Sequence, residues 1–206
     1  MADPSYDPRY FEEDHVFDAP GLLGWLTGRR KSAVLALLHS GLSPNARVLD
    51  VGCGYGDMLA ETRRDVRIGV DVNFSALRQA ATRRSGALFA MAAVEQLPFA
   101  SNSFDGVICS EVLEHLEHPA VLAQEIVRVT KPNGVYCITV PNEGITTFGR
   151  FILGKRPAKS PAHKQQFTPE TIAALFPTPP EVTIMAPYAP LPFALSTNVV
   201  ARFRKR

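Results

Sequence analysis

Short apolar runs and helical patterns alternate along this chain of 206 residues, and turn residues separate them. Runs such as residues 48–51 and 135–140 are too short for helices and rich in β-branched side chains, so they predict buried strands. Between such runs, apolar positions three or four residues apart predict amphipathic helices. Strands that alternate with helices are typical of a parallel sheet with helices on both faces. The pattern therefore predicts an α/β fold.

The pattern also gives approximate bounds for the elements. Strands are predicted at residues 48–51, 66–72, 87–91, 106–110, 135–140, 181–185 and 198–203. Helices are predicted at residues 57–64, 120–130 and 168–175, with one more after Asp71 and an N-terminal one that ends near Leu38. Residues 1–24 are polar and carry three prolines, so they predict an irregular arm. Residues 143–166 break the regular alternation.

Composition changes this picture little. The chain is 46% apolar, which suits one sizeable core. Its 22 basic and 20 acidic side chains nearly balance, so the charge gives no reason to expect nucleic-acid binding. We find no apolar run of about 18 residues for a membrane span, and no signal-peptide pattern at the N-terminus. Because Cys53, Cys109 and Cys137 are widely spaced, we expect neither disulfides nor a bound metal. We expect a single domain over residues 1–206. We also expect the protein to lie in the reducing cytoplasm.

The strongest signal is a glycine turn directly after the first predicted strand. Residues 48–56 read V-L-D-V-G-C-G-Y-G, with Asp50 in the strand and a glycine at every second position of the turn. Glycine permits a sharp turn and lets backbone N–H groups approach a ligand closely. Asp71 ends the next strand about 20 residues after the first glycine, at the spacing of a carboxylate that binds ribose hydroxyls. Together these features predict a nucleoside-binding site.

These motifs resemble those of the class I S-adenosylmethionine-dependent methyltransferases. The resemblance rests on V-L-D-V-G-C-G-Y-G, on G-V-D-V-N after it, and on residues 97–105, 112–115 and 129–134 in the right order. Dinucleotide-binding dehydrogenases usually space their glycines G-x-G-x-x-G, whereas this chain has G-x-G-x-G. The resemblance implies a Rossmann-like, doubly wound, mostly parallel sheet of seven strands with an antiparallel last strand. It also implies methyl transfer to a small-molecule acceptor.

The resemblance further implies which residues bind S-adenosylmethionine. Contacts are expected at the carboxyl ends of the strands and from an N-terminal arm, residues 1–28, that lies over the cofactor. The expected residues are Trp25, Arg29, Asp50, Gly52, Cys53, Gly54, Gly56, Asp71, Val72, Val94, Glu95, Ser110 and Glu111. Ala93 occupies the place of an adenine-binding Asp, so either the backbone of residues 93 and 94 or Glu95 would read the adenine. For Trp25 the alternative is a structural anchor of the first helix.

Two histidines are candidates for catalysis at the acceptor site. His115 ends the V-L-E-H stretch after the fourth strand, and histidine is a general base near neutral pH. His163 begins a stretch similar to the H-x-x-x-F-T element of the same family. The predicted acceptor-side loop, residues 143–167, is apolar and then basic, which suits an anionic or lipid-like acceptor. The alternatives are a packing role for His115 and a solvated loop.

Three functions of different classes remain at this point. The motifs together favour a small-molecule methyltransferase, in which alignment of nucleophile, methyl and sulfur supplies much of the rate. The glycine spacing disfavours a nicotinamide-dependent oxidoreductase. Ala93 leaves open a non-catalytic relative that only binds the cofactor. The sequence also leaves open the acceptor, its methylated atom and the oligomeric state.

Overall fold

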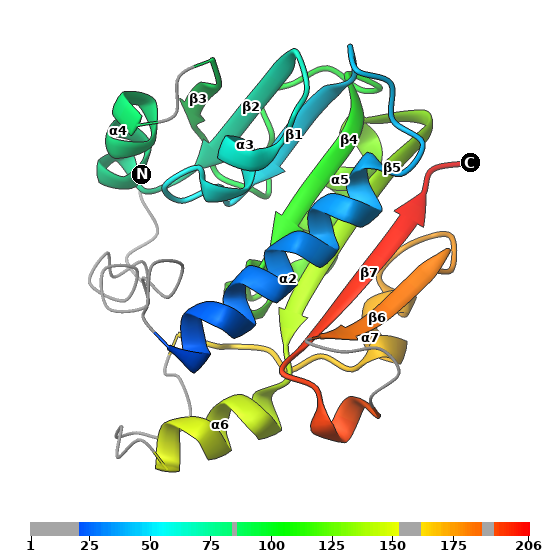
Figure 1. The fold of residues 1–206 in the computed structure, drawn as a ribbon. Coiled ribbons are helices and arrows are strands. Elements are labelled where there is room, and N and C mark those ends of the chain that lie inside the picture. The colour runs from blue at the N-terminus through cyan, green and yellow to red at the C-terminus, as the bar shows by residue number, and fades with distance from the viewer. Residues whose placement is uncertain (1–20, 84–85, 153–161, 187–191) are drawn as a thin grey trace.

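The fold is built on a seven-stranded sheet (Figure 1), and the computed structural model describes residues 21–83, 86–152, 162–186 and 192–206. The strands are β1 (Arg47–Val51), β2 (Val66–Asp71), β3 (Leu88–Met91), β4 (Phe104–Ser110), β5 (Thr130–Pro141), β6 (Val182–Ala186) and β7 (Asn198–Arg204). Their order in the sheet is β3-β2-β1-β4-β5-β7-β6. The sheet is parallel from β3 to β5, and β7 is antiparallel to β5 and β6. This architecture confirms the prediction.

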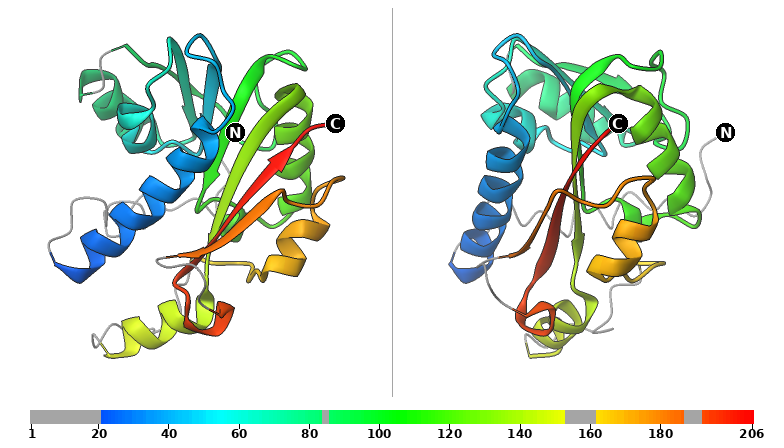
Figure 2. Two further views of the ribbon diagram at one scale, coloured as in Figure 1. Left: turned by 45° about the vertical axis from the view of Figure 1, so that its right-hand side comes forward. Right: turned by 90° about the vertical axis from the view of Figure 1, so that its right-hand side faces the viewer.

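Helices cover both faces of the sheet (Figure 2). α2 (Leu22–His39) and α3 (Asp57–Glu61) lie on one face, and α5 (Pro119–Val129) and α7 (Pro169–Ala174) lie on the other. The other helical segments are α4 (Phe74–Arg83), α6 (Glu143–Ile152), η1 (Leu113–His115) and η2 (Phe193–Leu195). Side chains alternate along each strand, so β4 sends Val107 and Cys109 into the core under α5 and Ile108 into the core under α2.

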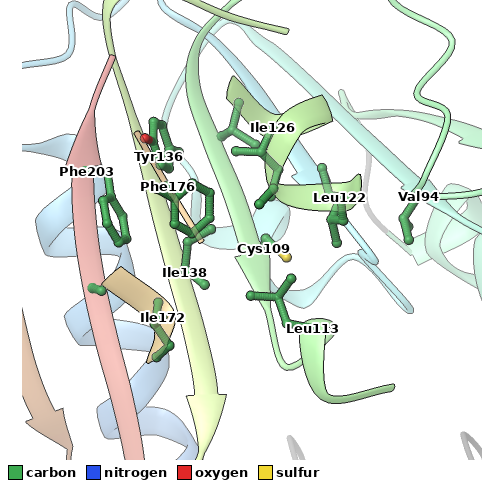
Figure 3. Close-up of a cluster of buried hydrophobic side chains, with 14 of the residues drawn as sticks. Val94, Cys109, Leu113, Leu122, Ile126, Tyr136, Ile138, Ile172, Phe176 and Phe203 are labelled. Atoms are coloured by element: carbon green, nitrogen blue, oxygen red, sulfur yellow. The ribbon is translucent and has the colours of Figure 1, made fainter. Parts of the chain in front are cut away.

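Aromatic rings fill the core beside α7 (Figure 3). Tyr136 on β5 stacks on Phe203 of β7 with 5.2 Å between ring centroids, and Phe176 lies 5.0 Å and 4.5 Å from these two rings. Full burial of one such side chain stabilises the fold by about 1.5–3 kcal/mol. The stack therefore holds the antiparallel strand β7 against β5.

The observed bounds differ from the predicted ones for local reasons. α3 ends at Glu61 because Thr62 takes extended backbone angles and its hydroxyl donates to the carbonyl of Met58 at 2.9 Å. β5 begins at Thr130 because this residue already pairs with Phe104 of β4. The pairing is then interrupted by an irregularity around Asn133, whose φ is +63°, and resumes after it. α2 begins at Leu22, so the predicted irregular arm is already helical there. Residues 1–20 of that arm lie outside the described residues.

Helix α6 lies where we predicted a break in regular structure. It runs from Glu143 to Ile152 and exposes Phe148, Phe151 and Ile152. Residues 153–161 of the predicted acceptor-side loop lie outside the described residues. Among the helices that the structure describes, none combines the length and apolarity that a bilayer span needs.

Candidate functional site

The glycine turn between β1 and α3 holds three left-handed residues. Gly52, Gly54 and Gly56 have φ values of +71°, +49° and +74°, which L side chains rarely adopt. A Cβ on Gly52 would lie 2.3 Å from a methyl carbon of Val112, and one on Gly56 would lie 2.9 Å from the ring of Phe89. A Cβ on Gly54 would meet nothing within 4 Å. The outer glycines therefore serve packing, and Gly54 faces open space.

Asp71 at the end of β2 is tied to this turn. One carboxylate oxygen accepts from the N–H of Gly54 and the other from the N–H of Asn73, each at 2.8 Å. Asp71 is 5% exposed, and burial raises its pKa while the two N–H bonds oppose that shift. An ionised carboxylate has about four lone-pair sites, so acceptor capacity remains for two hydroxyl groups. The predicted ribose contact requires this capacity.

Asp50 and Cys53 lie beneath the turn. Asp50 is 2% exposed, and burial together with the nearby Asp71 carboxylate raises its pKa well above the usual range. Burial also raises the pKa of the Cys53 thiol, whose sulfur would lie 2.6 Å from a Cβ on Gly69. Both side chains therefore support the turn from within the fold, and a ligand on the turn would meet Cys53 through its backbone.

The predicted adenine side offers an exposed apolar residue at the end of β2. Val72 is 40% exposed, although it directly follows the buried Asp71. Val94 is buried in the core, as Figure 3 shows, so its backbone is better placed for a ligand than its side chain. Ala93 and Glu95 are exposed. Val72 thus provides an apolar surface on which a base can pack.

Glu111 directly follows β4 in a left-handed conformation, with φ of +58°. Its carboxylate accepts from Thr139 Oγ1 at 2.7 Å and from Asn198 Nδ2 at 2.9 Å, and it pairs with Arg30 Nη1 at 2.8 Å. Ser110 Oγ lies 2.9 Å from the same Thr139 hydroxyl. A non-glycine residue in this region costs about 1–3 kcal/mol and persists where surrounding contacts fix it. Contacts from α2, β5 and β7 fix Glu111.

Helix α2 approaches the same edge of the sheet through a residue that we did not predict. Arg30, the neighbour of the predicted cofactor residue Arg29, pairs with Glu111. Arg30 lies four residues before the buried Val34 and thus on the same helix face, which is the signal that distinguishes the two arginines. Trp25 is 42% exposed, so it is not a core anchor of α2.

The structure brings His115 and His163 together. Their rings lie 5.0 Å apart between centroids, close to edge-to-face. Nδ1 of His163 contacts Oε1 of Glu143 at the start of α6. Nδ1 of His115 lies 3.1 Å from the carbonyl oxygen of Ala162. Glu143 lies in the predicted acceptor-side loop, but its contact with His163 was not predicted because no local pattern in the sequence indicates it.

Glu114 is the buried member of this cluster. It is 1% exposed, and burial raises its pKa well above the usual range, with the negative charge of Glu111 adding to the shift. Its carbonyl oxygen accepts from the N–H groups of Lys164 and Gln165 at 2.7 Å and 3.1 Å. These two bonds attach the segment that carries His163 to η1. The cluster is therefore fixed by the backbone as well as by side chains.

The fold and the site together define a class of protein. In a doubly wound α/β sheet, a glycine turn after the first strand and a carboxylate at the end of the second lie where nucleoside cofactors bind. The protein is thus a Rossmann-like domain of the nucleoside-cofactor-binding class.

Comparisons with known proteins give the family. The family described as methyltransferase domain matches residues 49–138. A ubiquinone biosynthesis O-methyltransferase of Paracidovorax citrulli is 31% identical over 168 residues, which cover 75% of this chain and 66% of that protein. A demethylmenaquinone methyltransferase of Renibacterium salmoninarum is 36% identical over 114 residues, which cover 54% of this chain and 47% of that protein.

A solved structure shows the same fold. The S-adenosylmethionine-dependent methyltransferase from Mesorhizobium loti superposes with a TM-score of 0.66 at 18% identity, covering 87% of this chain and 100% of that chain. This chain belongs to the class I S-adenosylmethionine-dependent methyltransferases, as its motifs predicted. It spans 47% and 66% of the lengths of the two relatives described above.

Proposed function

We propose that this protein binds S-adenosylmethionine at the glycine turn and transfers its methyl group to a small-molecule acceptor. The observation that carries the proposal is the pairing of Gly54 with Asp71, which places an open backbone turn beside a carboxylate with spare acceptor capacity. The sulfonium methyl is already activated, so the protein must mainly align the reactants. Alignment alone supplies about 7–11 kcal/mol in favourable cases.

The acceptor that we propose is lipid-like, with a polar head that carries the methylated atom. α6 begins beyond the carboxyl end of β5 (Figure 1), next to the cluster of His115 and His163. It exposes Phe148, Phe151 and Ile152, which suit an apolar tail, while the histidines and glutamates suit the head. Two similar proteins are named for menaquinone and ubiquinone, and their names support a quinone-like acceptor.

Thermal unfolding with S-adenosylmethionine, S-adenosylhomocysteine and NAD, each in large excess, tests the cofactor. A ligand at 100 times its dissociation constant stabilises the folded state by about 2.7 kcal/mol, which corresponds to roughly 5–11 °C for a chain of this size. We expect both sulfur compounds to raise the melting temperature and NAD to leave it unchanged. A rise with NAD alone would instead support the oxidoreductase alternative.

The Asp71→Asn variant tests where the cofactor lies. Replacing the carboxylate weakens hydrogen bonds to a charged acceptor, worth about 1.5–3 kcal/mol, so S-adenosylhomocysteine should bind about 10- to 150-fold more weakly in calorimetry. Asp65→Asn is the matched control, because Asp65 is an exposed acid just before the same strand. Equal affinity in the two variants would remove Asp71 from the site.

Turnover separates the enzyme from a relative that only binds the cofactor. Phenolic acceptors with and without an isoprenoid tail would be incubated with the protein and S-adenosylmethionine. We expect S-adenosylhomocysteine to form faster with the tail-bearing acceptors. A protein that binds the cofactor and yet releases no S-adenosylhomocysteine, even with cell extract, would support the non-catalytic alternative.

A further inference from the structure

Three potential metal ligands converge next to Glu111. One ligand atom each of Glu114, His115 and His163 lies within 4.8 Å of the other two. Neighbouring atoms bound to one ion at about 2.1 Å lie about 3–3.5 Å apart, so modest side-chain movements would close the set around an ion. From the sequence we expected no bound metal, because we considered only the cysteines as ligands. These ligands come instead from two segments that only the fold brings together.

Both imidazoles are oriented in the way that metal-bound histidines are. Nδ1 of His115 faces the carbonyl oxygen of Ala162, and Nδ1 of His163 faces a carboxylate oxygen of Glu143. A carbonyl or an ionised carboxylate can only accept, so Nδ1 of each neutral ring carries the proton and Nε2 carries the lone pair. Histidines that bind a metal almost always donate their other N–H to such a group.

Buried carboxylate oxygens add a second, independent observation. Among the residues that the structure describes, Oε2 of Glu114 and Oε2 of Glu143 are buried without a hydrogen-bond partner. A buried polar atom without a partner is costly, and more so when it is charged. The carboxylates of Glu111 and Glu143 also disfavour a negative charge on Glu114. A divalent cation would both satisfy Glu114 and compensate this local excess of negative charge.

We propose that Glu114, His115 and His163 bind a divalent transition-metal ion, and that Glu143 orients His163. Two imidazoles with a carboxylate suit ions such as Zn²⁺, Mn²⁺ or Co²⁺ better than Mg²⁺, which prefers oxygen ligands. Three protein ligands leave coordination positions for an oxygen of the acceptor, whose pKa the ion would lower. This role rests on the proposed methyl transfer, whereas binding of the ion does not.

Metal titration without cofactor or acceptor tests the site. The full chain would be treated with EDTA, freed of the chelator, and titrated with Co²⁺, Zn²⁺, Mn²⁺ and Mg²⁺ by calorimetry, with visible absorption as a second readout for Co²⁺. We expect one Co²⁺ or Zn²⁺ per chain, weaker Mg²⁺ binding, and a Co²⁺ spectrum with imidazole ligands. His115→Asn, His163→Asn and Glu114→Gln should each weaken Co²⁺ binding by at least roughly 10- to 100-fold. Removing a group that only orients a metal ligand already weakens binding by this factor, and these variants remove the ligands themselves.

A neighbouring histidine provides a matched control. His118 is exposed and lies just beyond η1, so His118→Asn should bind Co²⁺ as the unmodified protein does. Circular dichroism would confirm that each variant is folded. Binding that is equal in ligand and control variants, or a folded metal-free protein that takes up none of the four ions, would overturn the proposal. The thermal shift with S-adenosylmethionine does not depend on this result, so the two proposals fail separately.

Discussion

The two regions that we propose as the cofactor side and the acceptor side of this sheet edge differ in what forms them. Around Gly54 the surface is backbone, shaped by left-handed glycines and held by the bond from Gly54 N–H to Asp71. Around Glu114 the surface is made of titratable side chains from segments far apart in the chain. We infer that substitutions in the glycine turn itself act through shape, whereas those around Glu114 act through charge and ligation.

Gly54→Val is expected to have the largest effect. Its Cβ would meet no protein atom within 4 Å, so the added side chain would fill the space that we assign to the cofactor. The thermal shift with S-adenosylhomocysteine should disappear, while strain at positive φ lowers the unfolding free energy by only about 1–2 kcal/mol. Gly41→Val is the control, because Gly41 also has positive φ, +86°, but lies after α2 and away from the turn. Normal binding by Gly54→Val would contradict the assignment.

Glu111→Gln tests the acceptor side, where charge should matter more than shape. Glutamine keeps the size of the side chain but removes the negative charge that faces Arg30, whose side chain is 12% exposed. We expect the unfolding free energy to fall by about 1–3 kcal/mol in chemical denaturation.

A second ion pair on α2 gives the matched control for Glu111→Gln. Lys31 pairs with Glu61, whose side chain is 53% exposed, so Glu61→Gln should cost less than about 1 kcal/mol. If the two variants lost the same stability, the partly buried charge at Glu111 would have no special role.

Ser110→Ala should have the smallest effect, because Ser110 lies between the two sides. Its hydroxyl is 2.9 Å from that of Thr139, and loss of one hydrogen bond costs about 0.5–1.5 kcal/mol. If the hydroxyl also contacts the cofactor, S-adenosylhomocysteine should bind roughly 2- to 10-fold more weakly in calorimetry. Ser103→Ala removes a similar bond, to the carbonyl of Ala100, in an exposed turn. Equal cofactor affinity in both variants would limit Ser110 to a structural role.

The cofactor side was the more predictable of the two because its signals are local. A β-branched run, alternating glycines and an acid at fixed spacing lie within residues 48–71, and each has a direct structural meaning. The strands followed from the same alternation, and the antiparallel direction of the last strand followed from the family resemblance. What the sequence did not show is that Gly52 and Gly56 serve packing, since Val112 and Phe89 approach them only in the fold.

The acceptor side was less predictable because it depends on contacts between distant segments. The segment Glu143–Ile152 contains two glycines and several β-branched residues, which are weak helix formers, so α6 was not expected. Without α6 and the return of the chain at Ala162, the pairing of Glu143 with His163 has no local signature. His115 and His163 were each named from a motif, but their proximity was not.

The place of β7 in the sheet has a consequence for the protein during its synthesis. β7 pairs with both β5 and β6, yet it follows both in the chain. Ribosomes add about 5–20 residues per second, so for several seconds β5 has left the ribosome and presents an unpaired edge. Such an edge is a template for pairing with another chain. The nascent chain is therefore most exposed to aggregation after its parallel strands are complete and before β7 emerges.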